Sequence, residues 1–451
     1  MKHTFLLLLL FPAAALAQAP ATPAVSPAGR GGAAPVLTLR EALQTALKNS
    51  LDIEISTTNV EVQQTRNTLG FAGGLPTVGV AASTNGVINN TSQEIFNAST
   101  GGTTDRVVTG AQSSQYAAGL TGSYLLYNGG RVKATRKRLG ELEQISKLQL
   151  NSTVQNVLAD VSLKYFAVVQ QQRFIRTLQA SAEVSRQKLR LIEARQSVGL
   201  ANNADKFQAQ LDLNAQLLTQ GQQELAAQQA TADLLRALTL DPLGTVAVED
   251  SIPVDRNLTF QDIDAALAQN PDLQAAERQV AVQQLIERET QAARFPALSV
   301  NGGTNFNRAQ NAVGNTLFNQ SYGPYVGLGL SVPLYTGGVN KRLVDIARLN
   351  TRTAELQSKA QQQTYRTNVL KAWEAYEQQL KQVATAEQNY TTARKLLKLV
   401  QLRLDAGLST LVDVKLAQQS FEDAGYRLVN YRYAAKTAEI TLRQYAALLT
   451  P

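Results

Sequence analysis

The sequence predicts a mainly α-helical protein with a membrane β-barrel, in which one helix-strand-strand-helix unit occurs twice. Three observations lead to this fold class. Several short motifs recur at one constant spacing, long helical segments carry a heptad pattern, and four segments with strand-like alternation contain no charged residue. Recurrence of the same elements in the same order indicates a duplicated structural unit.

The duplication is visible in four landmarks, each of which recurs 208 residues later in the chain. The pairs are Tyr127-Asn128-Gly129-Gly130 with Tyr335-Thr336-Gly337-Gly338, Val198-Gly199-Leu200 with Ala406-Gly407-Leu408, Asp205 with Asp413, and Ala209-Gln210 with Ala417-Gln418. Constant spacing across separate landmarks predicts two structural repeats, at residues 36–244 and 245–451.

The N-terminal segment has the composition of a secretion signal. Lys2 precedes an apolar core, and Ala15-Leu16-Ala17 has the small-residue pattern of a cleavage site. We therefore expect a signal peptide at residues 1–17, which is too short to span a bilayer as a helix. Residues 18–35 are rich in Ala, Pro and Gly and predict a flexible leader.

Each repeat is expected to contain three helices, the second of which is very long. The predicted ranges are Thr38–Gly74, Gly130–Ser197 and Asn203–Leu240, then Thr259–Arg294, Gly338–Ala406 and Thr410–Leu448. Apolar or small residues step by four and three along the long helices, as at Leu178, Ala182, Ser185, Leu189 and Ile192. This stripe is typical of coiled-coil packing. A helix of nearly 70 residues extends about 100 Å, more than a compact domain can bury.

Four strands are predicted near residues 77–88, 115–127, 297–307 and 321–335. In the last, an apolar series that includes Tyr322, Val326 and Leu330 alternates with small or polar residues. One apolar face and no charge are typical of a membrane barrel strand, although one such strand alone would suit an ordinary soluble sheet. The connections Asn89–Ser114 and Arg308–Gln320 are polar and are expected to be extracellular loops.

Four strands are too few to close a barrel, because about eight are the practical minimum. Unpaired backbone groups in lipid are costly, so the chain is expected to pool strands with copies of itself. Two copies would give eight strands around an interior filled with side chains, whereas three would give twelve strands and room for a lumen.

The composition argues against an enzyme and against the commonest cofactor sites. The only histidine is His3, inside the predicted signal, and the chain has no cysteine. The mature protein therefore cannot form a Ser-His-Asp or Cys-His catalytic group, a zinc site with His or Cys ligands, or a disulfide. No phosphate-binding Gly-x-x-x-x-Gly-Lys loop is present. We expect no catalytic residue, no cofactor and no metal.

The duplicated order of elements, the Tyr-x-Gly-Gly strand exits and the Gly-Leu helix turns resemble the TolC-like outer-membrane efflux proteins. The resemblance covers the chain from Leu37 to Leu449. It implies a homotrimer with a 12-stranded β-barrel in the outer membrane and a 12-helix α-barrel in the periplasm. It also implies a passive duct for small molecules or proteins, which docks to a periplasmic adaptor (membrane fusion) protein and an inner-membrane pump.

In the family that the chain resembles, the helix-hairpin tips face the adaptor. The tips here are Val198, Gly199, Leu200, Ala201 and Asn202, and Ala406, Gly407, Leu408, Ser409 and Thr410. The glycines would permit a left-handed turn, and each leucine would be an exposed apolar side chain. Plain helix capping explains the same residues without a partner. Ser409 and Leu416 stand where some relatives carry charged gate residues, so their gating network is not expected here.

Asp205 and Asp413 have two interpretations. The resemblance places acidic residues near the entrance constriction, where six carboxylates from three copies would favour cations. Alternatively, Asn202-x-x-Asp205 and Thr410-x-x-Asp413 are capping boxes at the starts of helices.

Basic residues cluster after the second strand, at Arg131, Lys133, Arg136, Lys137 and Arg138. They indicate either a solvated helix face or contact with anionic outer-membrane lipid. Nucleic acid is not an expected partner, because the other basic residues are spread among acids.

The competing function is a periplasmic coiled-coil adaptor or scaffold, which accounts for the heptads but not for the uncharged strands.

Overall fold

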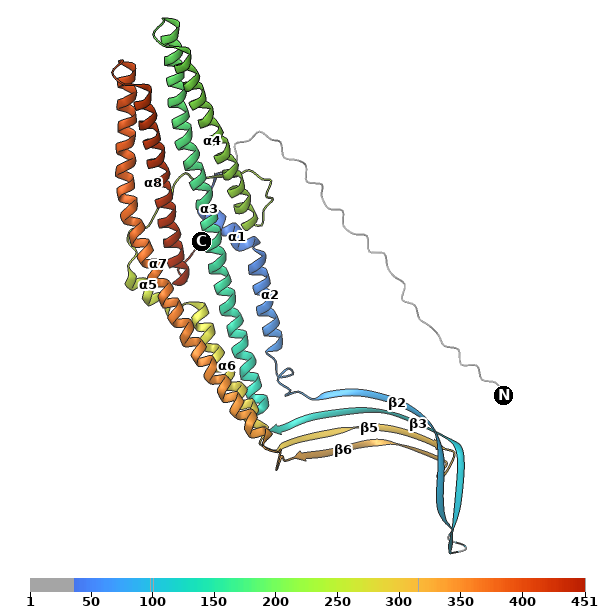
Figure 1. The fold of residues 1–451 in the computed structure, drawn as a ribbon. Coiled ribbons are helices and arrows are strands. Elements are labelled where there is room, and N and C mark those ends of the chain that lie inside the picture. Colours follow the sequence, from blue (N-terminus) through green and yellow to red (C-terminus); the bar gives the residue numbers. More distant parts are fainter. Residues whose placement is uncertain (1–35, 98, 100, 315, 451) are drawn as a thin grey trace. The chain divides into compact units, whose positions relative to one another are not determined.

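The computed structural model describes residues 36–450 apart from 98, 100 and 315 (Figure 1). The predicted signal peptide at 1–17 and leader at 18–35 lie outside the described residues. Among the described residues, none of the helices combines the length and the apolar character that a membrane crossing requires.

Four helices form the two long hairpins. Helices α3 (Arg131–Ser197) and α7 (Val339–Asp405) each have 67 residues, and α4 (Asn203–Ala237) and α8 (Leu411–Tyr445) each have 35 (Figure 1). The bounds of each pair differ by the same 208 residues as the sequence motifs. The structure therefore contains the duplication that the sequence predicted.

The first helix of each repeat is broken in two, where the sequence predicted one. The first repeat has α1 (Leu39–Asn49) and α2 (Leu51–Arg66), and the second has α5 (Phe260–Leu267) and α6 (Pro271–Ala292). The breaks have a local cause. The Ser50 side chain caps α2, and the Asn270 Oδ1 accepts from the backbone N–H of Asp272 at 2.9 Å, with Pro271 at the first helical position.

The helices pack side by side in one layer. In the hairpin half the contacts run in the order α4-α3-α8-α7, and nearer the strands they run α2-α3-α6-α7. Most of the predicted stripe on α3 is core, since Leu178, Ala182, Ser185 and Ile192 are at most 2% exposed, whereas Leu189 is half-buried. Small residues in this stripe let neighbouring helices approach closely.

A short parallel pair joins the two repeats beside this layer. Strand β1 (Val36–Leu37) pairs with β4 (Ala247–Val248), which lies in the linker between the repeats. The Tyr165 hydroxyl of α3 fixes the pair, because it donates to the Leu37 carbonyl at 2.9 Å and accepts from the Glu249 N–H at 3.1 Å. The linker is thereby held against α3.

The main sheet has four antiparallel strands in the order β2-β3-β5-β6. They are β2 (Thr77–Asn97), β3 (Gly102–Asn128), β5 (Ala297–Asn311) and β6 (Phe318–Ser331). Strands β3 and β5 are hydrogen-bonded to a neighbour on both sides. Strands β2 and β6 each have one edge without a partner among the described residues. The sheet is thus open at both sides.

The register places most of the apolar side chains of the four strands on one face. Val326 stands opposite Gly302, Gly302 opposite Gly122, and Gly122 opposite Val78. Val78 and Val326 are 70% and 81% exposed, so this apolar face is uncovered in a single chain. The same face carries Val80, Ala118, Leu120, Tyr124, Val300, Phe306, Tyr322, Leu328 and Leu330. The other face carries mainly small and polar residues, with Val87, Leu125 and Tyr325 as exceptions.

The prediction of a loop at Asn89–Ser114 is wrong, because most of these residues belong to β2 and β3, which pair as far as Asn97 and Gly102. A register shift near Asn90 interrupts the pairing, and Gly110, with φ of 70°, donates to the Asn90 Oδ1 at 2.9 Å. Figure 1 shows the β2–β3 hairpin bending in this region. The Asn, Ser and Thr composition suggested a loop, but an exposed two-stranded ribbon tolerates those residues.

Candidate functional site

The two hairpin tips have the same turn geometry. Gly199 and Gly407 both adopt φ of 75°, a left-handed conformation that glycine permits without a Cβ penalty. The next residues close the turn, since the Leu200 N–H donates to the Arg195 carbonyl at 2.8 Å and the Leu408 N–H donates to the Arg403 carbonyl at 2.7 Å. The predicted glycine turns are therefore present at both tips.

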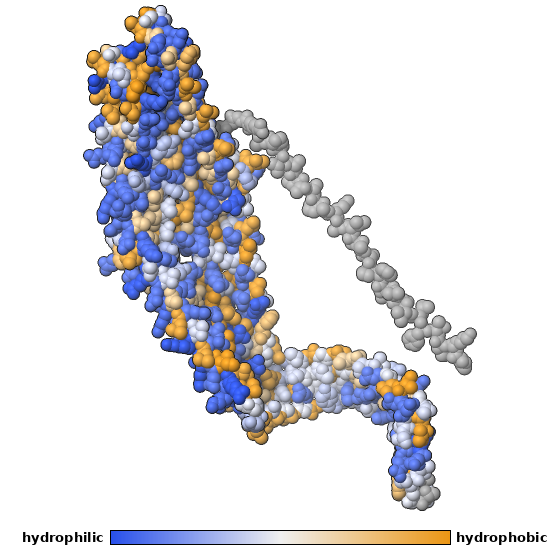
Figure 2. Space-filling model, in the orientation of Figure 1, coloured by the Kyte–Doolittle hydropathy of each residue, from blue (hydrophilic) through white to orange (hydrophobic). Residues whose placement is uncertain are grey.

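Apolar side chains are exposed at these turns. Val198, Leu200 and Leu408 are 68%, 77% and 68% exposed. Ala201 and Ser409 are half-buried, and the other tip residues are exposed. Figure 2 shows hydrophobic residues gathered at this end of the hairpins, above a largely hydrophilic helical surface. Exposed apolar groups of this kind suit contact with another protein.

Asp205 and Asp413 both form capping boxes, as one of the two interpretations predicted. The Asp205 N–H donates to the Asn202 Oδ1 at 2.8 Å, and the Thr410 N–H donates to the Asp413 Oδ2 at 2.8 Å. Hydrogen bonds from the Thr410 backbone, the Thr410 side chain and Ser409 lower the pKa of the Asp413 carboxyl. One chain thus carries a half-buried capping carboxyl, Asp205, at one tip and an exposed one, Asp413, at the other.

A buried ion cluster, which sequence reasoning missed, joins the two hairpins below the tips. Asp212 of α4 accepts from Lys188 of α3 at 2.6 Å and from Lys415 of α8 at 3.0 Å. Burial alone would raise the pKa of Asp212, but hydrogen bonds from the two lysines and Gln208 lower it. A signal was present in the sequence, because Lys188 interrupts a run of core positions.

A polar network continues this junction along α3 and α8. The Gln418 amide donates to the Ser181 hydroxyl at 2.6 Å and to the Ser185 hydroxyl at 3.0 Å. The Ser181 hydroxyl also donates to Glu422. Gln418, Ser181 and Ser185 are buried, so the two hairpins meet through satisfied polar groups as well as apolar ones.

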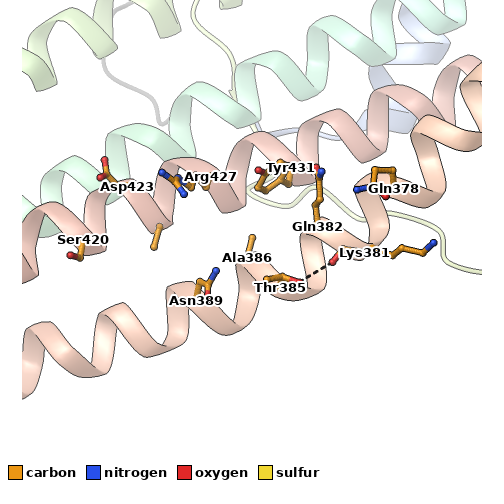
Figure 3. Close-up of a pocket in the computed structure, with 11 residues that line it drawn as sticks. Gln378, Lys381, Gln382, Thr385, Ala386, Asn389, Ser420, Asp423, Arg427 and Tyr431 are labelled. Atoms are coloured by element: carbon orange, nitrogen blue, oxygen red, sulfur yellow. Dashed lines mark hydrogen bonds between the residues drawn. The ribbon is translucent and has the colours of Figure 1, made fainter.

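A polar groove, also missed from the sequence, runs between α7 and α8 (Figure 3). It has a volume of about 520 Å³, and Ala386 and Ala424 lie between its polar side chains. The polar side chains come from both helices and include Gln382, Thr385, Asn389, Asp423 and Arg427. Side chains of this kind favour contact with water.

The basic cluster occupies the first two turns of α3, directly after β3. Arg138 forms an ion pair with Glu289 at 2.7 Å, whereas Arg131, Lys133 and Lys137 are exposed. Lys133 and Lys137 also line a hollow of about 360 Å³ beside α6. A solvated helix face and contact with lipid both remain predictions for this cluster.

Among residues 36–450, with 98, 100 and 315 set aside, no group of three or more His, Cys, Asp or Glu side chains is placed to hold a metal ion. The sites of interest are therefore the tips, the junction between the hairpins, and the faces of the sheet and helices.

Comparison with known proteins identifies the type of molecule. The model of the outer membrane efflux protein family matches residues 42–239 and 263–448. The chain is 27% identical over 425 residues to the pyoverdine export outer membrane protein OpmQ of Pseudomonas aeruginosa, covering 90% of this chain and 84% of the relative. It is 27% identical over 317 residues to the outer membrane protein TolC of Vibrio cholerae, covering 67% and 70%. The fold is similar to that of the Campylobacter jejuni outer membrane channel CmeC, with a TM-score of 0.72 and 19% identity over 91% of this chain and 85% of that one.

Proposed function

The chain belongs to the outer membrane efflux protein family and is an outer-membrane channel, and we propose that three copies of it form one export duct. The family consists of transport channels rather than enzymes. That this chain belongs to the family favours an export duct over the alternative of a periplasmic coiled-coil adaptor or scaffold.

The open edges of the fold carry the proposal. One edge of the chain consists of β2, α2 and α4, and the other consists of β6 and α7. The two edges differ, so copies associate head to tail, and such an interface forms a ring where the rotation closes. β6 of one copy would pair with β2 of the next, which satisfies the backbone groups that lipid leaves unpaired.

The helical edges carry matching apolar stripes. Leu211, Leu218 and Leu225 of α4 are seven residues apart and are 63%, 72% and 54% exposed. On α7, Leu399 and Leu402 near the tip end are 55% and 58% exposed, and Leu349 and Leu356, which are seven residues apart nearer the strands where α7 would meet α2, are 67% and 51% exposed. Heptad spacing on both edges suits coiled-coil packing of α7 against α4 and α2 of the neighbour.

The number three follows from the space inside the ring. Two copies would give eight strands, and side chains would fill that barrel. Three copies give twelve strands and twelve helical positions around the periplasmic tube, with room for a lumen. The polar face of the sheet and the polar groove between α7 and α8 would line it, and the apolar sheet face would meet lipid.

The hairpin tips are the proposed docking surface for a periplasmic adaptor protein, which would link the duct to an inner-membrane pump. The exposed Leu200 and Leu408 support this assignment. The pump would supply the energy, so the duct itself remains passive. Cysteines at these two positions are expected to crosslink to the adaptor, whereas a cysteine at Lys359, on the exposed surface of α7, is not.

A disulfide experiment tests the ring. The chain has no native cysteine, so only the introduced cysteines can crosslink. Leu211 lies about nine residues into α4 and Leu399 about seven residues before the end of α7, so they are at similar heights. We expect the double variant Leu211→Cys/Leu399→Cys to form covalent dimers and trimers on oxidation in membranes. Neither single variant should do so, nor should Leu211→Cys/Asn389→Cys, whose second cysteine lies in the polar groove. Monomers alone in the Leu211→Cys/Leu399→Cys lane would refute the ring.

A further inference from the structure

A second cleft lies beside α3, α7 and α8, and its lining is rich in arginine. It has a volume of about 790 Å³. Arg173 and Arg176 come from α3, Arg394 from α7 and Arg432 from α8. A smaller adjoining recess shares Arg173 and Arg432 and adds Arg256 from the linker between the repeats. We call these five residues and the space between them the arginine cleft.

The ion pairs in the arginine cleft leave an excess of positive charge. Asp250 pairs with Arg173, whose Nε lies 2.8 Å from the Oδ1, and also with Arg176. Glu387 lies 2.8 Å from Arg432 and 3.8 Å from Arg256. Two carboxylates thus face five guanidinium groups.

Arg394 is the cation with the least internal compensation. It is exposed, and within the described part of the chain it forms no ion pair. Burial, and then repulsion from Arg432, lower the pKa of Arg173. The cleft therefore holds several like charges close together, an arrangement that an anionic ligand would stabilise.

The base of the arginine cleft is apolar. Phe421 and Leu428 of α8 are 5% and 8% exposed, and Ile252 of the linker is half-buried beside them. The Tyr390 ring packs on Phe421 with the centroids 5.5 Å apart. Basic groups around an apolar base suit a ligand that carries both carboxylates and apolar side chains.

We propose that the arginine cleft binds an acidic peptide segment of a periplasmic partner protein. A guanidinium group pairs with a carboxylate through two parallel hydrogen bonds, which makes arginine the preferred cation for this contact. The guanidinium groups come from three helices and a linker, so an extended chain with several carboxylates matches them better than one small anion does.

The position of the cleft keeps it accessible and separates it from the tips. It lies between elements of one chain, and the edges at which neighbouring copies would join run along α2, α4 and the far side of α7. Arg394 is about 17 Å from the end of α7 and Arg432 about 32 Å from the start of α8, at 1.5 Å per residue. The contact is thus distinct from the proposed docking of an adaptor at the tips.

Peptide binding to the purified full-length protein tests the proposal. The probe is a fluorescein-labelled octapeptide of alternating Glu and Phe, measured by anisotropy in low-salt detergent buffer. We expect saturable binding that weakens as salt rises, and no binding of the matching Lys and Phe peptide. Arg394→Gln should weaken binding severalfold, and Arg394→Gln/Arg432→Gln about tenfold or more.

Arg427→Gln is the matched control, because it removes the same charge from α8 but lies in the polar groove outside the cleft. It should bind the peptide as the wild type does. Thermal unfolding should show that all variants are folded, and Arg394→Gln disturbs no ion pair within the described residues. Equal binding by the wild type and the double variant would overturn the proposal. Absence of binding, or displacement of the peptide by equimolar inorganic phosphate, which would indicate a small-anion site, would also overturn it. The disulfide experiment on the trimer is independent of all these outcomes.

Discussion

At the scale of single residues, Asp205 and Asp413 show how one side chain can serve two purposes. The sequence left capping and an acidic entrance as alternatives, and the structure places each carboxylate in a capping box at an exposed tip. Capping uses the oxygen atoms of the side chain, whereas an entrance would use its charge. The two contributions can therefore be separated by a substitution that keeps the oxygen and removes the charge.

The variant Asp205→Asn/Asp413→Asn makes that separation. We expect its channels in planar bilayers to lose cation preference, because six negative charges per trimer disappear. Thermal unfolding should change little, since asparagine can still accept the backbone hydrogen bonds. Asp423→Asn removes a carboxylate from the polar groove instead, so an equal loss of cation preference in that variant would show that the effect is not specific to the entrance. Unchanged cation preference in the double variant would remove both residues from the entrance.

The lowered pKa of Asp413 also predicts a pH dependence. A carboxyl whose pKa is lowered in the folded state contributes stability above its unfolded pKa of about 3.8, and that contribution is lost as pH falls through the folded value. The difference in thermal midpoint between wild type and Asp413→Asn should therefore be largest at neutral pH and shrink below pH 4. A difference that grows on acidification would contradict this assignment.

At the scale of elements, the junction between the hairpins rests on a buried ion cluster. The Lys188 side chain is 4% exposed and that of Asp212 is 15% exposed, so removal of Lys188 leaves the Asp212 carboxylate with only Lys415, whose side chain is 48% exposed. We expect Lys188→Met to destabilise the protein by about 3 kcal/mol, as seen when buried ion pairs are broken. Chemical denaturation of the detergent-solubilised protein measures this change.

The matched variant is Lys188→Met/Asp212→Leu, which replaces both charges with apolar side chains. It should recover much of the lost stability, because two well-packed apolar groups avoid the desolvation cost. A double variant less stable than the single one by another ~3 kcal/mol would contradict this assignment.

The helices and strands also show which parts of the fold can be predicted from sequence patterns. Long helices, glycine turns and strand positions followed from periodicity and from the duplication, because these depend on neighbouring residues. The breaks at Ser50 and Asn270 were missed, since a capping side chain within a helical pattern has no strong signal of its own. The arginine cleft could not be predicted, because its residues are spread from Arg173 to Arg432 and meet only through tertiary packing.

At the scale of the whole molecule, the proposed duct depends on two open edges and one mainly polar face of the sheet. A sheet that is apolar on one side and polar on the other has a natural orientation in a closed ring, with the apolar side toward lipid. The helical layer also has a polar surface that would face the lumen, because the groove between α7 and α8 presents Gln, Thr and Asn side chains. The central claim is that this polar face surrounds the path of the cargo.

Modification of single cysteines in conducting channels tests that claim most directly. Asn389 lies in the polar groove, and Lys398 is nine residues further along α7, which places it on the opposite side of the helix. Treatment of Asn389→Cys trimers with a negatively charged methanethiosulfonate reagent should change the single-channel conductance, whereas Lys398→Cys trimers should be unaffected. A response from Lys398→Cys with none from Asn389→Cys would contradict the account.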